Sequence, residues 1–559
     1  MKRFLKLAAV VAVAFSVSFC ASVEQMAKMA ALVKTESNPQ VLECVANQIP
    51  ASYTVKFPEK YFNQKAILKV TPVLVYNGGE MAGPDFWMQG EKIRDNYHVI
   101  AYNRASSMTR DLIFPYKEGV EKAKLELRAT VYNAAKTKSF AYPIPFKVAE
   151  GTNCTYMLAK TSGELFQEEH GYQKELTEEV ETQILYDVNK ADVKAARLNS
   201  KEIKEFEKFL KNAKKDSKRT VKSSKIVGYA SPEGPEDNNN KLSTQRARSA
   251  KAAYDKTIAK NAELDVDVKV EEKGEDWEGF KKLVEQSNLE DKDLIIRVLS
   301  MYQDPAIRER EIRNMSKVFQ TLNKKVLPQL RRSRIVTNVK RMNFTDDELK
   351  EMVKNNSDQL TESAMLYYAA NISKDKNEKI DILKKAAQKF NSEKALNNLA
   401  ALYLNYNEAD NAAKYLGQIK SKSAGLYNNL GVVQMQKGNY DKAAELFKMA
   451  KGENGEIIGI AKENLGAIDI LRGDYKSALK NLEGSTCYNY GLALILNGKL
   501  NEAKAYLKKE NCPNQSYLRA IIAARQGNES AVDTELSKAF KLEKYEKRAE
   551  NDIEFAGLE

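Results

Sequence analysis

The chain has few of the residues on which enzymes most often depend, since only two of its 559 residues are histidine, His98 and His170, and only five are cysteine. Histidine is the usual proton-transfer group and metal ligand at neutral pH, so little material is left for either role. Neither histidine lies near a cysteine pair, and no Cys-x-x-Cys spacing occurs, which disfavours a zinc site. His-Glu-x-x-His, Gly-x-Ser-x-Gly and phosphate-loop motifs are also absent. We therefore expect no catalytic residue, no metal and no cofactor.

Beyond its N-terminus the sequence also lacks long hydrophobic runs. None approaches the roughly 18 apolar residues that a membrane-spanning helix needs. At the N-terminus, Lys2, Arg3 and Lys6 precede the short apolar run 7–15, a pattern typical of a secretion signal, which we predict over residues 1–20. Any membrane attachment of the mature protein would then depend on a lipid or on a partner.

The end of that signal leaves two processing routes open. Val17-Ser18-Phe19-Cys20 resembles a lipoprotein cleavage box, which would put a lipid on Cys20, whereas cleavage by an ordinary signal peptidase beside Ala21 is the alternative. Either route delivers the protein to the cell envelope, and we expect it at the periplasmic face of the outer membrane. Residues 21–40 are expected to form a helical linker.

Four cysteines remain after Cys20, namely Cys44, Cys154, Cys487 and Cys512. An even number suits an oxidising compartment, and the positions suggest that Cys44 pairs with Cys154 and Cys487 with Cys512. In the loop-entropy model each such closure contributes about 3 to 5 kcal/mol. Four buried thiols are the alternative, because spacing alone does not establish pairing.

Residues 41–156 have the pattern of an antiparallel β-sandwich. In residues 124–132 apolar and polar side chains alternate, which is typical of a half-buried strand, and residues 66–76 and 97–102 look similar. Six prolines and the turn at 77–79 separate these runs, so a small sandwich is the natural way to pack them. The segment has no recognisable chemistry, and both docking and spacing remain open as its role.

The most distinctive stretch is a strand, a turn and a helix over residues 226–247. In the helix, Leu242, Arg246, Ala250 and Tyr254 follow one another at intervals of four, so the guanidinium lies in a row that otherwise faces the sheet. A cation partly removed from water is tolerated when a carboxylate meets it in a bidentate pair. The stretch therefore predicts a site for a small anion, and a merely solvated Arg246 is the alternative.

This stretch resembles the OmpA-like peptidoglycan-associated domain, whose typical form is Gly-His-Thr-Asp-x-x-Gly, an Asn, and Leu-Ser-x-x-Arg-Ala. The matching residues are Gly228, Gly234, Asn239, Leu242, Ser243, Arg246 and Ala247. The resemblance implies that Arg246 holds the carboxylate of the diaminopimelate side chain in the peptidoglycan stem peptide. Ser231 stands where the family has its aspartate, and Glu233 is a candidate substitute two residues later. Asn239 completes this candidate set.

Residues 178–342 fit the same α+β family in their order of elements. We expect strands at 183–191, 226–230 and 264–270, a helix at 201–215, and a helical insertion at 274–328 that smaller family members lack. The segment 330–336 resembles the family's closing strand, Asn-Arg-Arg-Val, without its Asn. Because the family's arginine in that strand lies near the peptide site, the resemblance adds Arg332 to the candidate peptidoglycan-binding residues.

The C-terminal region, residues 356–545, repeats itself. The recurring positions are Leu430, Gly431, Gly438, Tyr440, Ala443 and Phe447, then Leu465, Gly466, Gly473, Tyr475, Ala478 and Leu482, then Tyr490, Gly491, Gly498, Leu500, Ala503 and Leu507. An earlier copy includes Leu399 and Ala400, and a weaker last copy includes Gly527.

These offsets resemble the tetratricopeptide repeat, a helix-turn-helix unit in which small residues let paired helices approach closely. The resemblance implies an all-α solenoid with a surface for protein segments, for which Tyr427, Asn428 and Asn429 are weak candidates. The spacing departs from a constant period, since Gly431 and Gly466 are 35 residues apart and Gly466 and Gly491 only 25. The shorter unit must join its helices tightly.

Charge and motifs together predict a non-enzymatic envelope protein. The formal net charge is +13, and residues 201–225 carry ten basic and four acidic side chains, which either attract anionic wall polymers or simply keep the chain soluble. We expect peptidoglycan binding by the OmpA-like domain and protein binding by the repeats, without nucleic acid. An assembly scaffold that has lost its peptidoglycan site is the main alternative. A wall hydrolase with paired carboxylates is a minor one, because acidic residues occur throughout.

Overall fold

The structure is a computed structural model that describes residues 22–507 and 512–557. The predicted signal peptide and the lipidation site Cys20 lie outside these residues. The chain divides into unit 1, Met1–Glu169 with Leu383–Glu559, and unit 2, His170–Ile382. Within the described ranges no helix is long and apolar enough to cross a bilayer. The same residues contain no cluster of three potential metal-ligating side chains.

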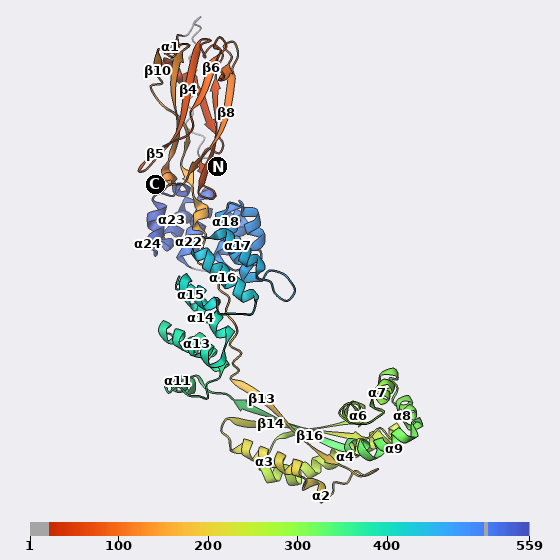
Figure 1. The fold of residues 1–559 in the computed structure, drawn as a ribbon. Coiled ribbons are helices and arrows are strands. Elements are labelled where there is room, and N and C mark those ends of the chain that lie inside the picture. The colour runs from red at the N-terminus through yellow and green to blue at the C-terminus, as the bar shows by residue number, and fades with distance from the viewer. Residues whose placement is uncertain (1–21, 508–511, 558–559) are drawn as a thin grey trace. The chain divides into compact units, whose positions relative to one another are not determined.

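The N-terminal part of unit 1 is β-rich, as the sequence predicts (Figure 1). One sheet has the order β1 (Lys34–Ser37), β3 (Gln48–Phe57), β8 (Ser106–Pro115). The other follows the order β10 (Ser139–Ala141), β9 (Lys124–Asn133), β4 (Ala66–Tyr76), β6 (Phe86–Gly90), β7 (His98–Ile100), with β5 (Gly79–Ala82) beside β4 and β11 (Phe146–Glu150) beside β9. A short parallel pair joins β2 (Leu42–Glu43) and β12 (Thr152–Asn153). Inward side chains of both large sheets share one hydrophobic core.

The expected helical linker over residues 21–40 is only partly helical. Helix α1 (Val23–Lys28) buries Met26 in the core of the β region, and β1 is already a strand of the first sheet. The prediction of a helical linker is therefore wrong for residues 34–37, which form β1. Its sequence, Lys-Thr-Glu-Ser, has no apolar alternation, and it forms a strand because β3 supplies the pairing partner.

The four described cysteines are free thiols, so the two disulfides expected from the sequence are not formed in this structure. Cys44 and Cys154 are nevertheless neighbours, each 2% exposed, and the Cys44 thiol donates to the Tyr156 hydroxyl at 3.7 Å. Hydrogen bonding to Cys44 and burial raise the pKa of Cys154. Bringing the two sulfurs together is a consequence of the β2–β12 pairing, and their oxidation stays a prediction.

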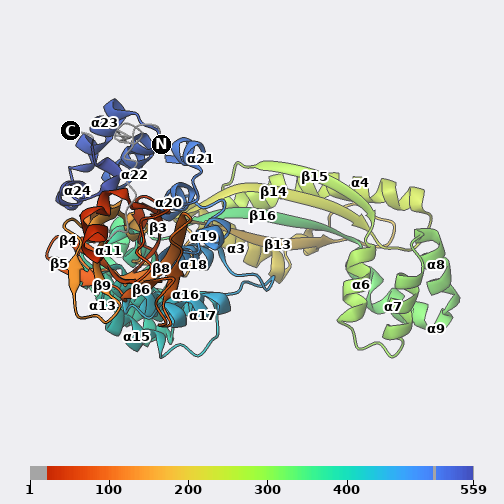
Figure 2. The same ribbon diagram turned by 90° about the horizontal axis from the view of Figure 1, so that it is seen from above.

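Unit 2 contains a four-stranded sheet in the order β13 (Glu175–Leu185), β16 (Arg332–Met342), β14 (Arg219–Ala230), β15 (Asp267–Glu275). Strands β14 and β15 are parallel, and the other two pairs are antiparallel. Helices α3 (Lys201–Lys215) and α4 (Glu236–Ala253) lie along the sheet (Figure 2). Their apolar side chains join those of the strands in one core. The strand, helix, strand, helix, strand and strand order is the predicted one.

The first strand of this sheet differs from its predicted range, 183–191. Strand β13 begins at Glu175 and ends at Leu185, and residues 186–191 leave the sheet as a loop. The strand pairs with β16 along its whole length. The beginning of the strand was not predicted, because glutamates at positions 178, 179 and 181 interrupt the alternation of apolar and polar residues that is typical of a strand.

The insertion after β15 is helical, as expected. It consists of α6 (Trp277–Glu285), α7 (Lys292–Met301), α8 (Pro305–Asn314), α9 (Ser316–Lys325) and α10 (Leu327–Leu330). These helices gather at one end of the sheet and have their own hydrophobic cluster, which includes Phe280, Ile295 and Leu322 (Figure 2). Helices α11 (Asp346–Lys354) and α12 (Glu362–Tyr367) follow β16 within unit 2, so unit 2 ends inside the region predicted as repeats.

The remaining C-terminal residues form tandem helix pairs after α13 (Lys376–Phe390). The pairs are α14 (Glu393–Asn405) with α15 (Ala409–Leu416), α16 (Ala424–Gln436) with α17 (Tyr440–Met449), α18 (Gly459–Leu471) with α19 (Tyr475–Asn481), α20 (Tyr488–Leu496) with α21 (Leu500–Tyr506), and α22 (Pro513–Arg525) with α23 (Glu529–Ala539). A Cβ atom at Gly431, Gly466 or Gly491 would lie 2.4 to 2.6 Å from Phe447, Leu482 or Leu507. The small residue in each copy therefore permits close packing of the two helices.

The last repeats and the β region share polar contacts and a core within unit 1. Glu554, in the turn Ile553–Phe555, accepts hydrogen bonds from Asn153 at 2.9 Å and Thr155 at 2.8 Å, and pairs with Arg525. Arg548 of α24 (Glu543–Ala549) donates to the Cys154 carbonyl at 2.9 Å. The β region is thus packed against the repeats, which its sequence alone did not indicate.

Candidate functional site

Arg246 lies on the face of α4 that packs against the sheet, as its spacing predicts. Its side chain is 1% exposed, and Ala247 and Ala250 on the same face are also buried. Helix α4 approaches β14 so closely that a Cβ at Gly228 would lie 2.2 Å from the Ser243 carbonyl. The matched glycine and alanine therefore have a packing role, because they bring the arginine-bearing helix against the strand.

Backbone carbonyls surround the Arg246 guanidinium. Its Nε donates to Lys190 O at 3.0 Å, Nη1 to Tyr229 O at 2.9 Å, and Nη2 to Asp187 O at 3.3 Å. The carbonyls of Asp187 and Lys190 belong to the loop that follows β13, in which Asn189 has a φ of +53°. Asparagine tolerates this left-handed conformation better than most residues, which helps the loop to fold around the guanidinium.

No carboxylate of the described chain lies within ion-pair distance of Arg246. Burial, together with the nearby charge of Arg331, lowers the pKa of Arg246 to about 10. Tyr186 and Glu233 act in the opposite direction. The ring of Tyr186 lies 5.2 Å from the guanidinium carbon. Neutral carbonyls thus bond each guanidinium nitrogen without balancing the charge.

Glu233 and Ser231 lie together but are already bonded. The Ser231 hydroxyl donates to Glu233 Oε1 at 2.7 Å, and Arg331 donates to the same oxygen at 2.8 Å. Arg331 and Ser231 are buried. We call Arg246, Arg331, Glu233 and Ser231 the arginine cluster. It contains two buried cations and one partly buried acid, so it carries an excess of one positive charge.

Asn239 holds the turn that carries Ser231 and Glu233. Its amide donates to Glu233 O at 3.3 Å, Gly234 O at 3.2 Å and Glu275 Oε1 at 2.8 Å. Gly234 has a φ of +94°, and its N–H donates to Glu309 of α8 at 2.6 Å. Asn239 therefore positions the turn, and the insertion contacts that turn directly.

The structure does not bring Arg332 into the arginine cluster. Arg332 instead makes an ion pair with Asp276 at 2.7 Å and donates to Gln183 at 3.0 Å. It lines a separate cleft of about 550 Å³ between the sheet and α6. Arg331, which the sequence comparison passed over, takes the position near Arg246. Neighbouring residues of an extended chain point in opposite directions, so only one of the two arginines can face the cluster.

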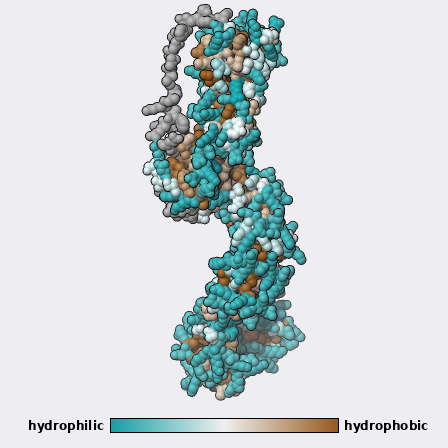
Figure 3. Space-filling view, turned by 90° about the vertical axis from the view of Figure 1, so that its left-hand side faces the viewer, coloured by the Kyte–Doolittle hydropathy of each residue, from teal (hydrophilic) through white to brown (hydrophobic). Residues whose placement is uncertain are grey.

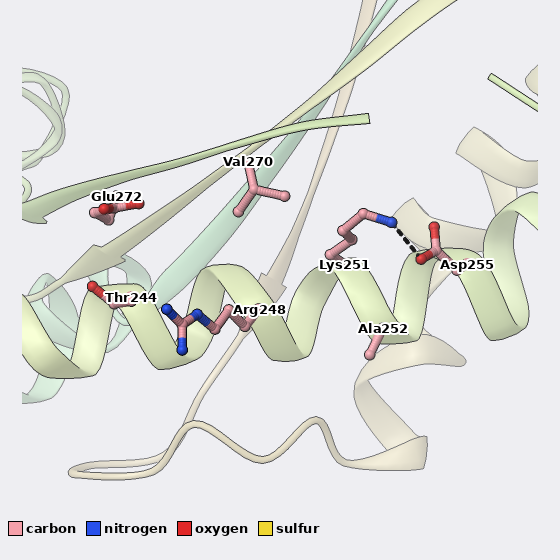
Figure 4. Close-up of a pocket in the computed structure, with 7 residues that line it drawn as sticks. All are labelled: Thr244, Arg248, Lys251, Ala252, Asp255, Val270 and Glu272. Carbon is pink, nitrogen blue, oxygen red and sulfur yellow. Dashed lines mark hydrogen bonds and ion pairs between the residues drawn. The ribbon is translucent and has the colours of Figure 1, made fainter. Parts of the chain in front are cut away.

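Another cavity, of about 440 Å³, lies between α4 and β15 (Figure 4). Thr244, Arg248 and Lys251 line it from α4, and Val270 and Glu272 from β15. Lys251 is paired with Asp255 at 2.6 Å in this view. None of the residues predicted to bind peptidoglycan lines this cavity.

Unit 1 contains a second candidate site, which we call the asparagine ladder. It consists of Asn398, Asn429, Asn464 and Asn489, each on the first helix of a pair and two residues before the small residue of its repeat. Residues 160–168, the docked segment, follow the β region and run along these helices without helix or strand structure (Figure 1).

Each ladder asparagine binds one residue of the docked segment through both backbone groups. Asn489 accepts from Lys160 N and donates to Lys160 O, both at 2.9 Å. Asn464 does the same with Glu164, Asn429 with Phe166 and Asn398 with Glu168, at 2.6 to 2.9 Å. The ladder bonds are therefore made to main-chain groups of the segment and not to its side chains.

Further amides support the ladder. Asn428 donates to Glu164 O at 3.0 Å and Asn397 to Phe166 O at 3.1 Å. Asn429 in turn donates to Asn397 Oδ1 at 3.0 Å, and Asn464 to Asn428 Oδ1 at 3.1 Å. The weak prediction for Asn428 and Asn429 thus pointed to residues that do contact a protein segment, although the segment belongs to the same chain.

A repeated Asn at one offset was the available sequence signal for the ladder. It precedes Leu399, Leu430, Leu465 and Tyr490 in four successive copies. Surface composition gives less guidance, because the face drawn in Figure 3 is mainly hydrophilic with scattered hydrophobic residues.

Comparisons with known proteins leave the family open. No family model matches the sequence, and no curated protein matches it. One similar solved structure is a tetratricopeptide repeat protein from Parabacteroides merdae, at 17% identity over 37% of this chain and 91% of that chain, with a TM-score of 0.29. Another is Pseudomonas aeruginosa pilF, at 15% identity over 37% of this chain and 99% of that chain, with a TM-score of 0.28. Scores this low carry no functional argument.

Proposed function

We propose that this chain is a non-enzymatic protein of the cell envelope, in which unit 2 binds the carboxylate of a peptidoglycan stem peptide and the helix pairs bind protein segments. The observation that carries the first part is the excess positive charge of the arginine cluster. The one carboxylate of the cluster, Glu233, is bonded to Arg331, and Arg246 has only neutral acceptors. A buried cation is costly unless an anion balances it, so a guest carboxylate would complete the cluster.

The resemblance to the OmpA-like domain supports a wall peptide as the source of that carboxylate. Gly228, Asn239, Arg246 and Ala247 match the family's sequence pattern, and Arg246 lies beside the junction of strand, turn and helix. A guest would have to displace a carbonyl from Arg246. The bond to Asp187 O is the longest of the three, so the loop after β13 is the part we expect to move.

Binding to purified peptidoglycan tests this proposal. The full chain would be sedimented with insoluble peptidoglycan and compared with Arg246→Ala, Arg246→Lys and the control Arg248→Ala, which changes an exposed residue two positions later on the same helix. We expect at least a tenfold loss of binding for Arg246→Ala, a smaller loss for Arg246→Lys because the charge stays but the planar fork is lost, and no loss for the control. Equal binding by all four chains would contradict the role of Arg246.

A scaffold that acts only by protein binding is the second candidate. It is favoured by the closed state of Arg246, which is 1% exposed, and by the eight backbone hydrogen bonds with which the ladder holds an extended segment. Absence of peptidoglycan binding by the native chain would select this candidate. Fractionation of cells that express the native chain or Cys20→Ala, with mass spectrometry of non-reduced peptides, would test the envelope location, the lipid and the two disulfides.

A further inference from the structure

The docked segment lies on the ladder as a peptide ligand would. Four of its residues, Lys160, Glu164, Phe166 and Glu168, exchange both backbone hydrogen bonds with a side-chain amide. Gln436 adds a bond to Ser162 O at 3.0 Å. Because these bonds use only the main chain, they are available to any peptide that can adopt the same backbone conformation, including the positive φ of Gly163.

Two contacts make the docking selective for side chains. Phe166 packs on Gly425 so closely that a Cβ there would lie 2.3 Å from the ring. Gly163 has a φ of +83°, and a Cβ at that position would lie 2.6 Å from Val432. The ladder surface thus has a place for an aromatic side chain and a point where the peptide main chain comes very close.

Glu164 fits this surface poorly. Burial and the nearby Glu463 of α18 raise the pKa of Glu164, while Lys160 of the same segment opposes the shift. Glu463 is fixed by a hydrogen bond from Ser485 at 2.8 Å. Asn464, which binds the backbone of Glu164, directly follows Glu463 on α18, so an acidic side chain at position 164 lies in the field of a second acidic residue. An uncharged or basic residue at this position would avoid that repulsion.

We propose that residues 160–168 are an internal ligand that covers a peptide-binding surface, and that the partner of this surface is an extended protein segment with an aromatic residue at the Phe166 position and an uncharged or basic residue at the Glu164 position. This inference rests on the proposed protein binding by the helix pairs and names the partner's chemistry. An internal ligand of imperfect fit stays bound because its covalent connection gives it a high effective concentration, of about millimolar for short linkers. A partner with a better fit can replace it.

The test uses the full chain and a fluorescent peptide of residues 158–170 that carries Glu164→Gln. Gly163→Ala in the full chain strains the docked segment without changing the helix pairs, so it should expose the ladder. Gly425→Ala fills the place of the Phe166 ring from the helix side and should block the internal and the added peptide alike. Phe166→Ala in the full chain is a second way to weaken the internal ligand, and circular dichroism checks that each variant folds.

Fluorescence anisotropy should show at least tenfold tighter peptide binding by the Gly163→Ala and Phe166→Ala chains than by the native chain. Combining either change with Gly425→Ala should abolish binding, and a peptide with the natural Glu164 should bind more weakly than the Gln peptide. Equal binding by the native and weakened chains would overturn the proposal and make the segment a permanent tie. Dimerisation of the weakened chains that excludes the peptide would also overturn it, because a second copy would then occupy the ladder. Peptidoglycan is absent from this assay, so failure of wall binding does not affect its outcome.

Discussion

The arginine cluster of unit 2 and the asparagine ladder of unit 1 both bury polar side chains, but they differ in whether the buried groups carry a net charge. Ladder amides are neutral, and each satisfies both backbone groups of one residue, so the surface is complete once an extended segment lies on it. In the cluster, each guanidinium nitrogen of Arg246 has one carbonyl acceptor and Arg331 is paired with Glu233, so the cluster retains a net charge. Polar groups therefore have hydrogen-bond partners in both places, while only the cluster still lacks a counter-ion.

The largest effect that separates the two regions should come from Arg246→Ala. Each of three partly buried carbonyls would lose its donor, at about 1 kcal/mol apiece, and removal of the desolvated charge would offset part of that loss. We expect the free energy of unfolding of unit 2 to fall by up to about 3 kcal/mol, measured by chemical denaturation with urea. An increase in stability would mean that the unbalanced charge outweighs its hydrogen bonds, and would strengthen the case for an anionic guest.

A smaller effect is expected from Asn429→Ala in the ladder. The change leaves the backbone N–H and C=O of Phe166 without this partner and removes a bond to Asn397, at a cost of about 2 kcal/mol. Hydrogen exchange of residues 160–168 should quicken accordingly. Asn411→Ala is the matched control. That asparagine is exposed on α15, and its side chain donates to Glu408 at the start of the same helix, away from the docked segment. Unchanged exchange in Asn429→Ala would show that the ladder does not hold the segment.

The smallest effect is expected from Glu164→Gln and from pH. A glutamate whose pKa is raised in the docked state binds a proton more tightly when docked, so docking is penalised above that pKa and improves as the pH falls through it. Glu164→Gln should remove this penalty, strengthen docking slightly at neutral pH and abolish the pH dependence. Exchange of residues 160–168, followed from neutral to acidic pH in both chains, measures this. Weaker protection in the Gln chain would contradict the repulsion from Glu463.

Local patterns predicted much of the fold. The helix pairs follow from repeats whose small residues recur at fixed offsets, and the burial of Arg246 follows from its row on α4. The range of strand β13 was predicted wrongly because its many polar residues obscure the alternation typical of a strand. Strand β1 was missed because it forms only by pairing with β3. Such strands are specified by their neighbours, which a linear pattern does not contain.

The candidate sites were less accessible to prediction. Arg331 and Arg332 are adjacent, and the choice between them depends on the direction in which the chain enters β16. The ladder joins residues that are between 230 and 329 positions apart, so the offset of its asparagines suggested no partner until the chain was folded.

The sequence by itself shows a composition that disfavours common enzyme chemistry. It also determined the helical period of the repeats and the inward direction of Arg246, because both depend on the spacing of nearby residues. Only the tertiary structure decided that carbonyls surround Arg246, that Glu233 binds Arg331, and that the chain's own residues 160–168 cover the ladder. Those arrangements depend on which distant backbone groups meet, since a buried donor or acceptor takes whatever partner the packing brings within reach.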